Sequence, residues 1–257
     1  MNFATHRHMI KWKLMLTTLP FTLVILLMTY LRTQTLAIAP LFEFSDTAPI
    51  ITVTALVIGF MLSGVMSDHK EGEKLPAEIA CGLQGIDDCI QADAPHLTDT
   101  DLTNLKHNHA LLCHAIVNWL FNRENAEKAY TALRMIVTAH GTPPSFKINV
   151  IRNIDAIRRS MTRIDVIRRT DFIHTGYALL DVFVTLTLAL LVFANFKQPA
   201  AQYAIIGSIS LVYVYMIRLI RDLDNPFDYA QDGSAGASEV DYFPILEAIT
   251  RFGYEHD

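Results

Sequence analysis

The stretch PIITVTALVIGFMLSGVM, from Pro49 to Met66, decides the fold, and the polar run SDHKEGEKLP follows it directly. An apolar helix of about 20 residues is long enough to cross the hydrocarbon core of a membrane. Hydrophobic residues make up 51% of the 257-residue chain, and they gather in blocks. Four blocks have the length of a membrane span: Leu14–Leu31, Thr47–Met66, Tyr177–Phe196 and Ala200–Ile220. We therefore predict an all-α polytopic membrane protein with four transmembrane helices.

The second of these helices has two kinds of face. Steps of three or four residues define a stripe formed by Thr52, Leu56, Phe60 and Ser63. Small residues at Gly59 and Gly64 leave room for a neighbouring helix to approach closely. One face of this helix is expected to pack against other helices, and another is expected to line something.

Basic residues predict the orientation in the membrane. The first apolar block is too long for a secretory signal, and Arg32 follows it without a small-residue cleavage pattern, so we expect a retained anchor. Among 21 Lys and Arg residues, only Arg32 and Lys197 fall on one side of the membrane if the N-terminus is cytoplasmic. This asymmetry predicts a multi-pass protein of the cytoplasmic membrane, with both termini and the middle segment in the cytoplasm.

The pattern divides the chain into residues 1–66 with two spans, a helical cytoplasmic domain at 67–173, two further spans at 174–220 and a tail at 221–257. The second span is expected to continue through Pro76 with a kink. Thr98, with Asp101 three residues later, is a helix start signal. A further helix is expected from about Asn125 to His140, ending at Gly141.

The segment Lys147–Asp171 is the clearest amphipathic helix of the cytoplasmic domain. Its apolar seam recurs at steps of four and three residues: Val150, Ile154, Ile157, Met161 and Ile164. Its other faces carry six arginines: Arg152, Arg158, Arg159, Arg163, Arg168 and Arg169. We interpret these arginines as a solvated basic face near the membrane surface, with a lipid or anion contact as the alternative.

Motifs for catalysis are missing from the sequence. It contains no nucleophile elbow, phosphate-binding loop or dinucleotide fingerprint, so we do not expect an enzyme. It also lacks a basic patch interleaved with aromatic residues, so no nucleic-acid partner is expected. The three cysteines, Cys81, Cys89 and Cys113, lie in the middle segment and are expected to be free thiols in a reducing cytoplasm.

Two places in the sequence offer histidines as candidate functional residues. The run HNHALLCH contains His107, His109, Cys113 and His114. His109 and Cys113 share a helical face and could supply two zinc ligands, but two ligands do not make a site, so a structural role is preferred. His69 follows Asp68 at the inner end of the second span, where it is either a proton-sensitive group or a plain interfacial histidine.

Acidic residues crowd the region after the fourth span. The helix is expected to stop at Asn225-Pro226, and Pro244 is expected to begin a short terminal helix. Four carboxylates surround the proline: Asp222, Asp224, Asp228 and Asp232. We call this region the acidic turn. Carboxylates on a proline-broken backbone can bind calcium through oxygen ligands, although the spacing differs from an EF-hand and a solvated turn is the alternative.

The order of these features resembles the bestrophin family of ion channels and its bacterial bestrophin-like relatives. The run LVIGFMLSGVMSDHKEGEKLPAEIA (Leu56–Ala80) is similar to the family's pore-lining second span and the segment after it. The long helical region before the third span also matches. The run RDLDNPFDY (Arg221–Tyr229) is similar to the acidic-Asn-Pro-Phe turn that forms a calcium clasp in animal members.

The resemblance implies a homopentamer with five copies of the second span around a central pore. It places a hydrophobic neck at Thr52, Leu56 and Phe60, and a candidate Ca²⁺ clasp at the four aspartates of the acidic turn. A ring of Leu56 and Phe60 would form a hydrophobic constriction, with charge selection at the pore mouths. Where the family has Arg-Trp-Trp, this chain has Asp68-His69-Lys70, and one neck position is a threonine.

We therefore expect an ion channel that passes anions such as chloride, or monovalent cations. Its pore residues would be Thr52, Leu56, Phe60, Ser63 and Asp68, and its partners would be copies of itself, membrane lipids and the permeant ions. The alternative is a non-conducting scaffold or sensor whose cytoplasmic helices bind a partner, because a fold does not determine function. The two differ in whether the stripe faces a central axis or the lipid.

Overall fold

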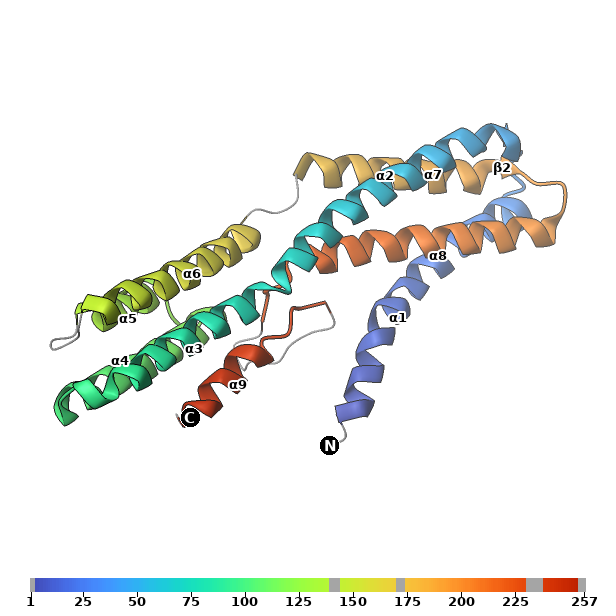
Figure 1. Ribbon diagram of the computed structural model, residues 1–257. Coiled ribbons are helices and arrows are strands. Elements are labelled where there is room, and N and C mark those ends of the chain that lie inside the picture. Colours follow the sequence, from blue (N-terminus) through green and yellow to red (C-terminus); the bar gives the residue numbers. More distant parts are fainter. Residues whose placement is uncertain (1–2, 139–143, 170–173, 230–237, 254–257) are drawn as a thin grey trace. The chain divides into compact units, whose positions relative to one another are not determined.

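The computed structural model describes residues 3–138, 144–169, 174–229 and 238–253, which form nine α-helices (Figure 1). The long helices of the apolar blocks are α1 (Phe3–Tyr30), α2 (Phe44–Gly72), α7 (His174–Phe193) and α8 (Pro199–Leu223). The remaining helices are α3 (Leu75–Asp93), α4 (Asp99–Leu120), α5 (Ala126–Thr138), α6 (Pro144–Arg169) and α9 (Phe243–Arg251). The predicted all-α class is confirmed, apart from two strands of two residues each.

The chain divides into two compact units. The first unit contains Met1–Asp68 and Thr170–Asp224, and the second contains His69–Arg169 and Asn225–Asp257. From Asn225 onward the tail therefore belongs to the same unit as the middle segment, although the sequence suggested that residues 221–257 form a region of their own.

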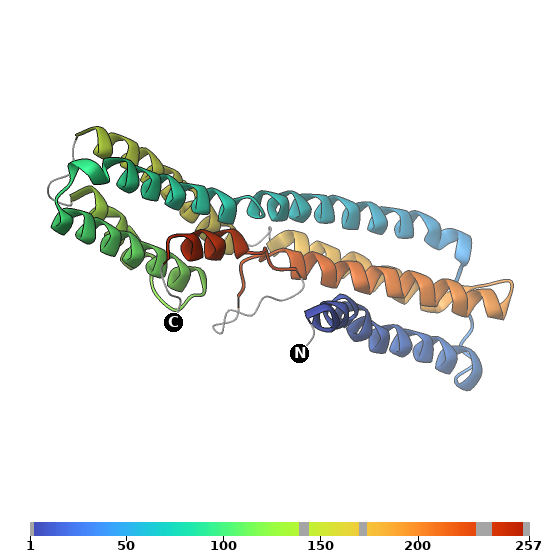
Figure 2. The ribbon, with the colours of Figure 1, turned by 60° about the horizontal axis from the view of Figure 1, so that its bottom comes forward.

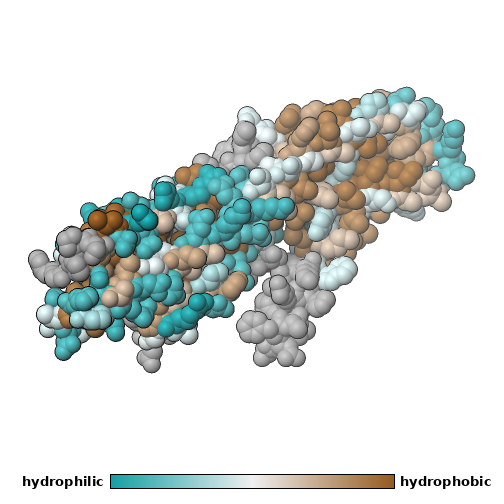
Figure 3. Space-filling view, viewed as in Figure 1, coloured by the Kyte–Doolittle hydropathy of each residue, from teal (hydrophilic) through white to brown (hydrophobic). Residues whose placement is uncertain are grey.

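The first unit holds helices that can cross a membrane. Four helices among the described residues are long and apolar enough to do so: Leu14–Thr35, one within Phe44–His96, Thr175–Phe193 and Pro199–Leu223. Figure 3 shows that the surface over these helices is mainly hydrophobic, whereas the surface of the second unit is mainly hydrophilic. The chain is therefore a multi-pass membrane protein.

A short parallel strand pair shortens the third span relative to the prediction. The span was expected to reach Phe196, but α7 ends at Phe193 and β2 (Ala194–Asn195) follows it. This strand pairs with β1 (Phe42–Glu43), and the Asn195 side-chain amide donates to Glu43 Oε1 at 3.0 Å. These contacts tie the start of α2 to the end of α7.

The interface between α1 and α8 is lined by small and hydroxyl-bearing side chains. Gly207 lies opposite Leu26, whose methyl carbons would be 3.6–3.7 Å from a Cβ added at Gly207. Thr18, Thr29 and Ser210 are buried, and each hydroxyl donates to a carbonyl of its own helix. Because the hydroxyls are satisfied within their helices, they can lie in an apolar environment without an unpaired donor.

An ion pair joins α7 to α8. Asp181, the acid predicted inside a span, accepts from Arg221 at 2.6 and 2.8 Å. Both side chains are about half exposed in the single chain, so this pair fixes the two helices against each other without a fully buried charge.

The second unit is a helical bundle with one continuous core. All five residues of the seam predicted on α6 are buried, from Val150 to Ile164, which confirms the prediction. The seam packs on α3, and α9 lies beside α3 on another side (Figure 2). The approach of α3 and α6 is close, because a Cβ at Gly82 would lie 2.5 Å from Ile157 Cγ1.

Helix ends follow the local signals in most places. The Asp101 amide donates to Thr98 Oγ1 at 3.2 Å, which confirms the predicted start of α4. α8 ends at Leu223 and α9 has Pro244 in its first turn, as expected. The predicted continuation through Pro76 has a short break: α2 ends at Gly72, Glu73 and Lys74 form a turn, and Pro76 lies in the first turn of α3, where its missing N–H costs nothing. The predicted end of the helix before Gly141 lies outside the described residues.

The arginines of α6 do not form one solvated face. Arg152, Arg159 and Arg169 are exposed, and Arg163 makes a bidentate pair with Glu71 at 2.6–2.7 Å. Arg168 contradicts the prediction, because its guanidinium packs over the ring of Trp119, with Cζ 5.2 Å from the ring centroid.

Candidate functional site

One face of α2 is held by the other helices of its unit. The Thr187 hydroxyl donates its only hydrogen to the Phe183 carbonyl at 2.8 Å. Its oxygen therefore accepts a hydrogen bond from the Thr54 hydroxyl, 2.7 Å away. The Tyr213 hydroxyl donates to the Ile51 carbonyl at 2.6 Å. Ile58, Met61 and Val65 pack with apolar residues of α7 and α8. These contacts fix the rotation of α2 about its own axis.

The predicted stripe lies on the opposite side of α2, and none of the residues that the structure describes covers it. We call Thr52, Leu56, Gly59, Phe60 and Ser63 the open face of α2. All five are exposed, Leu56 to 58% and Phe60 to 70%. A Cβ added at Gly59 would meet no atom within 4 Å. The open face must therefore contact lipid, water or another copy of the chain.

Thr52 presents mainly apolar atoms on this face. Its hydroxyl donates to the Ala48 carbonyl at 2.9 Å within the helix. The hydroxyl hydrogen is therefore not available to an ion, and the methyl group and an acceptor oxygen remain. The open face is apolar at Leu56 and Phe60 and weakly polar at its two ends.

The residues at the end of α2 differ in their relation to the open face. Each helical residue turns by roughly 100°, so Ser67 and Lys70 continue the line of Phe60 and Ser63. Both are exposed. Asp68, which the sequence suggested for the inner pore mouth, is exposed but turned about 120° from the centre of that line. Helical geometry therefore favours Lys70 over Asp68 as the charged continuation of the open face.

His69 is engaged with the C-terminal part of the second unit. Its Nε2 lies 2.7 Å from the Ser238 carbonyl, and its Nδ1 lies 3.8 Å from a carboxylate oxygen of Glu73. A carbonyl oxygen only accepts, so Nε2 carries the hydrogen and donates. The side chain is largely covered, so His69 makes a structural contact to the tail.

The histidines suggested as zinc ligands are dispersed. His109 and Cys113 lie in the core of the second unit, both fully buried, whereas His107 is exposed. Burial lowers the pKa of His109 to about 4, opposed by the nearby Asp87 and by a hydrogen bond with the Leu83 backbone. Burial likewise raises the pKa of the Cys113 thiol. Among the described residues, no group of three or more His, Cys, Asp or Glu side chains gathers as a metal site would require.

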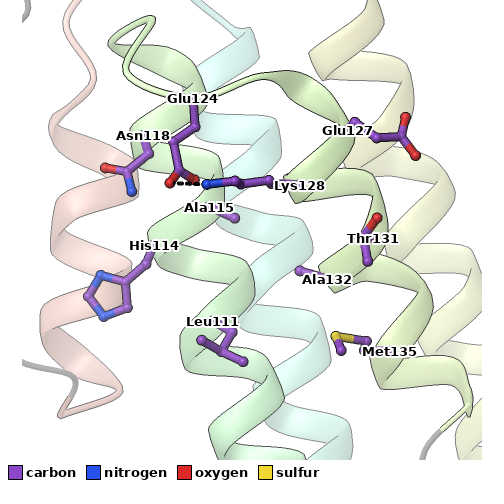
Figure 4. Close-up of a pocket in the computed structure, with 10 residues that line it drawn as sticks. All are labelled: Leu111, His114, Ala115, Asn118, Glu124, Glu127, Lys128, Thr131, Ala132 and Met135. Carbon is purple, nitrogen blue, oxygen red and sulfur yellow. Dashed lines mark hydrogen bonds and ion pairs between the residues drawn. The ribbon is translucent and has the colours of Figure 1, made fainter.

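His114 instead lines a surface groove between α4 and α5, which the sequence did not suggest (Figure 4). The groove has a volume of about 410 Å³. Leu111 and Met135 give it exposed apolar walls, and an ion pair between Lys128 and Glu124 at 2.6 Å lies at one end. The only sign of this groove in the sequence is a set of apolar residues at helical spacing. Residues of a buried core show the same spacing, so the sequence does not distinguish the two.

The four aspartates of the acidic turn are not all described within one unit. Asp222 and Asp224 belong to the first unit, Asp228 belongs to the second, and Asp232 lies outside the described residues. The turn is ordered by other contacts, since the Asn225 side-chain oxygen accepts from the Phe227 amide at 3.4 Å. The Ca²⁺ clasp therefore stays a prediction from the resemblance.

Known structures share this architecture. A variant of a bacterial bestrophin homologue from Klebsiella pneumoniae superposes with a TM-score of 0.75 at 13% identity, over 93% of this chain and 97% of that one. Another crystal structure of the Klebsiella homologue gives a TM-score of 0.70 at 12% identity, over 95% and 98% of the two chains. No protein-family model and no curated protein sequence matches the chain. The chain therefore has the fold of bacterial bestrophin homologues, as the resemblance suggested.

Proposed function

We propose that this protein is an ion channel whose conduction path runs along the open face of α2. The observation that carries the proposal is the division of α2 into two faces. One face is fixed by hydrogen bonds and apolar contacts within the chain, and the other exposes Leu56 and Phe60. The fold shared with bestrophin homologues supports the same function, because the bestrophins are a family of ion channels.

A pore of this kind requires several copies of the chain. One α2 helix cannot enclose a path, whereas a ring of them can place Leu56 and Phe60 around an axis. Such a ring forms a hydrophobic constriction that gates by dewetting. We propose a homopentamer, as the resemblance implies, with Thr52 and Ser63 at the two ends of the constriction.

The charge of the permeant ion is proposed from the end of α2. A ring of Lys70 side chains in line with the open face favours anions such as chloride, whereas a ring of Asp68 would favour monovalent cations. Since helical geometry favours Lys70, we propose anion preference. Lys70→Glu is expected to shift the reversal potential in a salt gradient toward cations, and Asp68→Asn is expected to leave it nearly unchanged. The opposite ranking would assign selectivity to Asp68.

We propose that the pore lies in the cytoplasmic membrane, and the distribution of basic residues supports this location. With the second unit and both termini in the cytoplasm, the basic residues lie mainly on the cytoplasmic side. Membrane lipids would cover the outer surfaces of the first unit. Labelling of single cysteines introduced near Lys197 and within α5 in intact cells tests this orientation, because only the first position should react with an impermeant reagent.

Single-channel recording of the purified protein in planar bilayers tests the proposal. Leu56→Ala and Phe60→Ala are expected to change the conductance or the open probability at least severalfold, because they widen the constriction. Val182→Ala is the matched control, since Val182 is 62% exposed on α7 and lies off the proposed path. Unitary currents that never appear, together with a single copy per particle in detergent, would favour the non-conducting scaffold or sensor.

A further inference from the structure

The guanidinium of Arg168 lies between two aromatic rings of the second unit. Its Cζ is 5.2 Å from the ring centroid of Trp119 in α4 and 6.0 Å from that of Phe227 in the acidic turn. Phe227 is fully buried. Cation–π attraction is strongest where water is excluded, so this arrangement stabilises a charge that an exposed arginine would leave in solvent.

The same guanidinium binds the end of α4. Arg168 donates through Nη2 to the carbonyl of Leu120, the last residue of α4, and through Nη1 to the Asn122 side-chain oxygen at 3.4 Å. Asn122 has a φ of 55°, a left-handed conformation that asparagine tolerates better than most residues and that ends the helix. A cation at this point also interacts favourably with the negative end of the helix dipole.

Carboxylates complete the surroundings of Arg168. Burial lowers the pKa of its guanidinium, while Asp165, Tyr229 and Asp228 raise it. Asp165 lies one turn earlier on α6, and Asp228 follows Phe227 in the acidic turn. The arginine therefore has acidic groups from its own helix and from the turn around it.

The turn is folded around Phe227 by contacts within the second unit. The Val240 amide donates to the Pro226 carbonyl at 2.8 Å, and the Tyr229 hydroxyl donates to the Val240 carbonyl at 2.6 Å. A Cβ added at Gly72 would lie 3.3 Å from the Phe227 ring, so the end of α2 closes over it. Phe227 thus packs against the end of α2 and against the Arg168 guanidinium of α6.

We propose that Arg168 is the resident cation of the acidic turn, so that the turn holds its fold without a bound metal ion. The guanidinium packs over Phe227 of the turn and donates to the end of α4, so it joins the turn to α4 and α6. The place it occupies is a binding site for a planar cation, formed by two aromatic faces, a backbone carbonyl, an amide oxygen and carboxylates. Emptying this place should therefore create a site for free guanidinium.

Thermal unfolding of the full-length protein in detergent tests the proposal. We expect the Tm of the wild type to be equal in millimolar calcium and in chelator. We expect Arg168→Ala to lower the Tm by about 5 °C or more, because it leaves the Leu120 carbonyl without its donor and removes the side chain that packs over Trp119 and Phe227. Millimolar methylguanidinium should raise the Tm of Arg168→Ala and leave that of the wild type unchanged.

Controls separate the cation from its packing. Arg169→Ala removes an exposed arginine from the next position of α6 and should change the Tm little. Arg168→Lys keeps the charge but loses the planar fork, so its Tm should lie between those of the wild type and Arg168→Ala. If Arg168→Ala does not fold, the Tm of Arg168→Lys and the calcium titration of the wild type still test the proposal.

Three results would overturn the proposal. The first is a rise in the wild-type Tm with calcium, because the turn would then depend on a metal ion. The second is an equal Tm for Arg168→Ala and Arg169→Ala. The third is a destabilised Arg168→Ala that methylguanidinium does not recover, because the side chain would then act through packing alone.

Discussion

The seam of α6 and the open face of α2 have the same helical period and opposite surroundings. Both are stripes at steps of three and four residues. The five seam residues, from Val150 to Ile164, are all buried, because α3 and its neighbours in the second unit cover them. The four stripe residues of α2, from Thr52 to Ser63, are all exposed, because the contacts of α2 with α7 and α8 lie on its other side.

The comparison teaches that a helical period identifies a face but not what covers it. In the second unit, water drives the apolar seam against other helices of the same chain. In the first unit, lipid is as apolar as the side chains, so an apolar stripe can stay uncovered within one chain. The seam is therefore expected to matter for folding, and the open face for assembly and conduction.

The covered seam can be broken at Ile157. Ile157→Ala removes a fully buried side chain at the close approach to Gly82, and we expect it to lower the free energy of unfolding by about 2–5 kcal/mol. Ile151 is the matched control on the same helix, since it is 43% exposed and Ile151→Ala should cost much less. Denaturant titration of the two variants measures both, and equal losses would contradict the assignment of the seam.

Acid should also weaken the covered region, through His109. Its pKa is lowered to about 4 in the folded protein, against about 6.5 when unfolded, so the unfolded state binds more protons between these values. The stability contributed by the neutral histidine is present above pH 6.5 and is lost as the pH falls toward 4, by on the order of 3 kcal/mol. Unfolding measured across this range should show a weaker pH dependence for His109→Gln than for His107→Gln, whose side chain is exposed.

The two faces of α2 can be compared directly in detergent. Ile58→Ala removes a side chain that packs within the first unit, and we expect it to reduce stability by about 2 kcal/mol. Phe60→Ala removes a larger side chain from the open face and should change the stability of the isolated chain little. Thermal unfolding of a monomeric preparation measures both, and a larger loss for Phe60→Ala would indicate that the chain itself covers this face.

A smaller effect is expected from hydroxyl groups on the two faces. Thr54→Val removes the donor to Thr187 between α2 and α7, and a hydrogen bond between spans contributes about 1 kcal/mol. Thr52→Val removes only a bond to the Ala48 carbonyl of the same helix, so we expect less loss of stability. Melting curves should rank the two variants in this order.

The smallest effect is expected at the surface ion pair between Arg163 and Glu71. Its side chains are 41% and 46% exposed, so solvent screens the attraction, and Arg163→Gln should cost less than about 1 kcal/mol. High salt should reduce the difference from the wild type further. A loss as large as that of Ile157→Ala would mean that the pair is buried in the assembled protein.

Several features of the fold could be predicted from the sequence because their causes are local. Span length and the α6 seam depend on residues within one helix. The start of α4 depends on Thr98 and Asp101, and the stop of α8 depends on the proline that follows it. The break between α2 and α3 was missed, since a proline fits both a kink and a first helical turn, and only the surrounding contacts choose between them.

The candidate site was predicted only in part. The sequence identified the stripe of Thr52, Leu56, Phe60 and Ser63 and suggested Asp68 for the pore mouth, whereas the proposal that Lys70 continues the stripe depends on the rotation of α2 that its contacts fix. It assigned Arg168 to solvent, because an arginine at the edge of a helix face resembles any other arginine in a sequence. Trp119 and Phe227 pack against Arg168, and both are distant from it in the chain.

By itself, the sequence determined that this protein has four apolar helices, an amphipathic bundle between them and a proline-broken acidic turn. Length, period and proline position act within a few residues of the chain, so they can be read without a fold. Only the tertiary structure decided that α2 leaves its striped face open, that a strand pair ends α7 and that Arg168 lies inside the turn region. Each of these depends on contacts between residues distant in sequence, which no local pattern records.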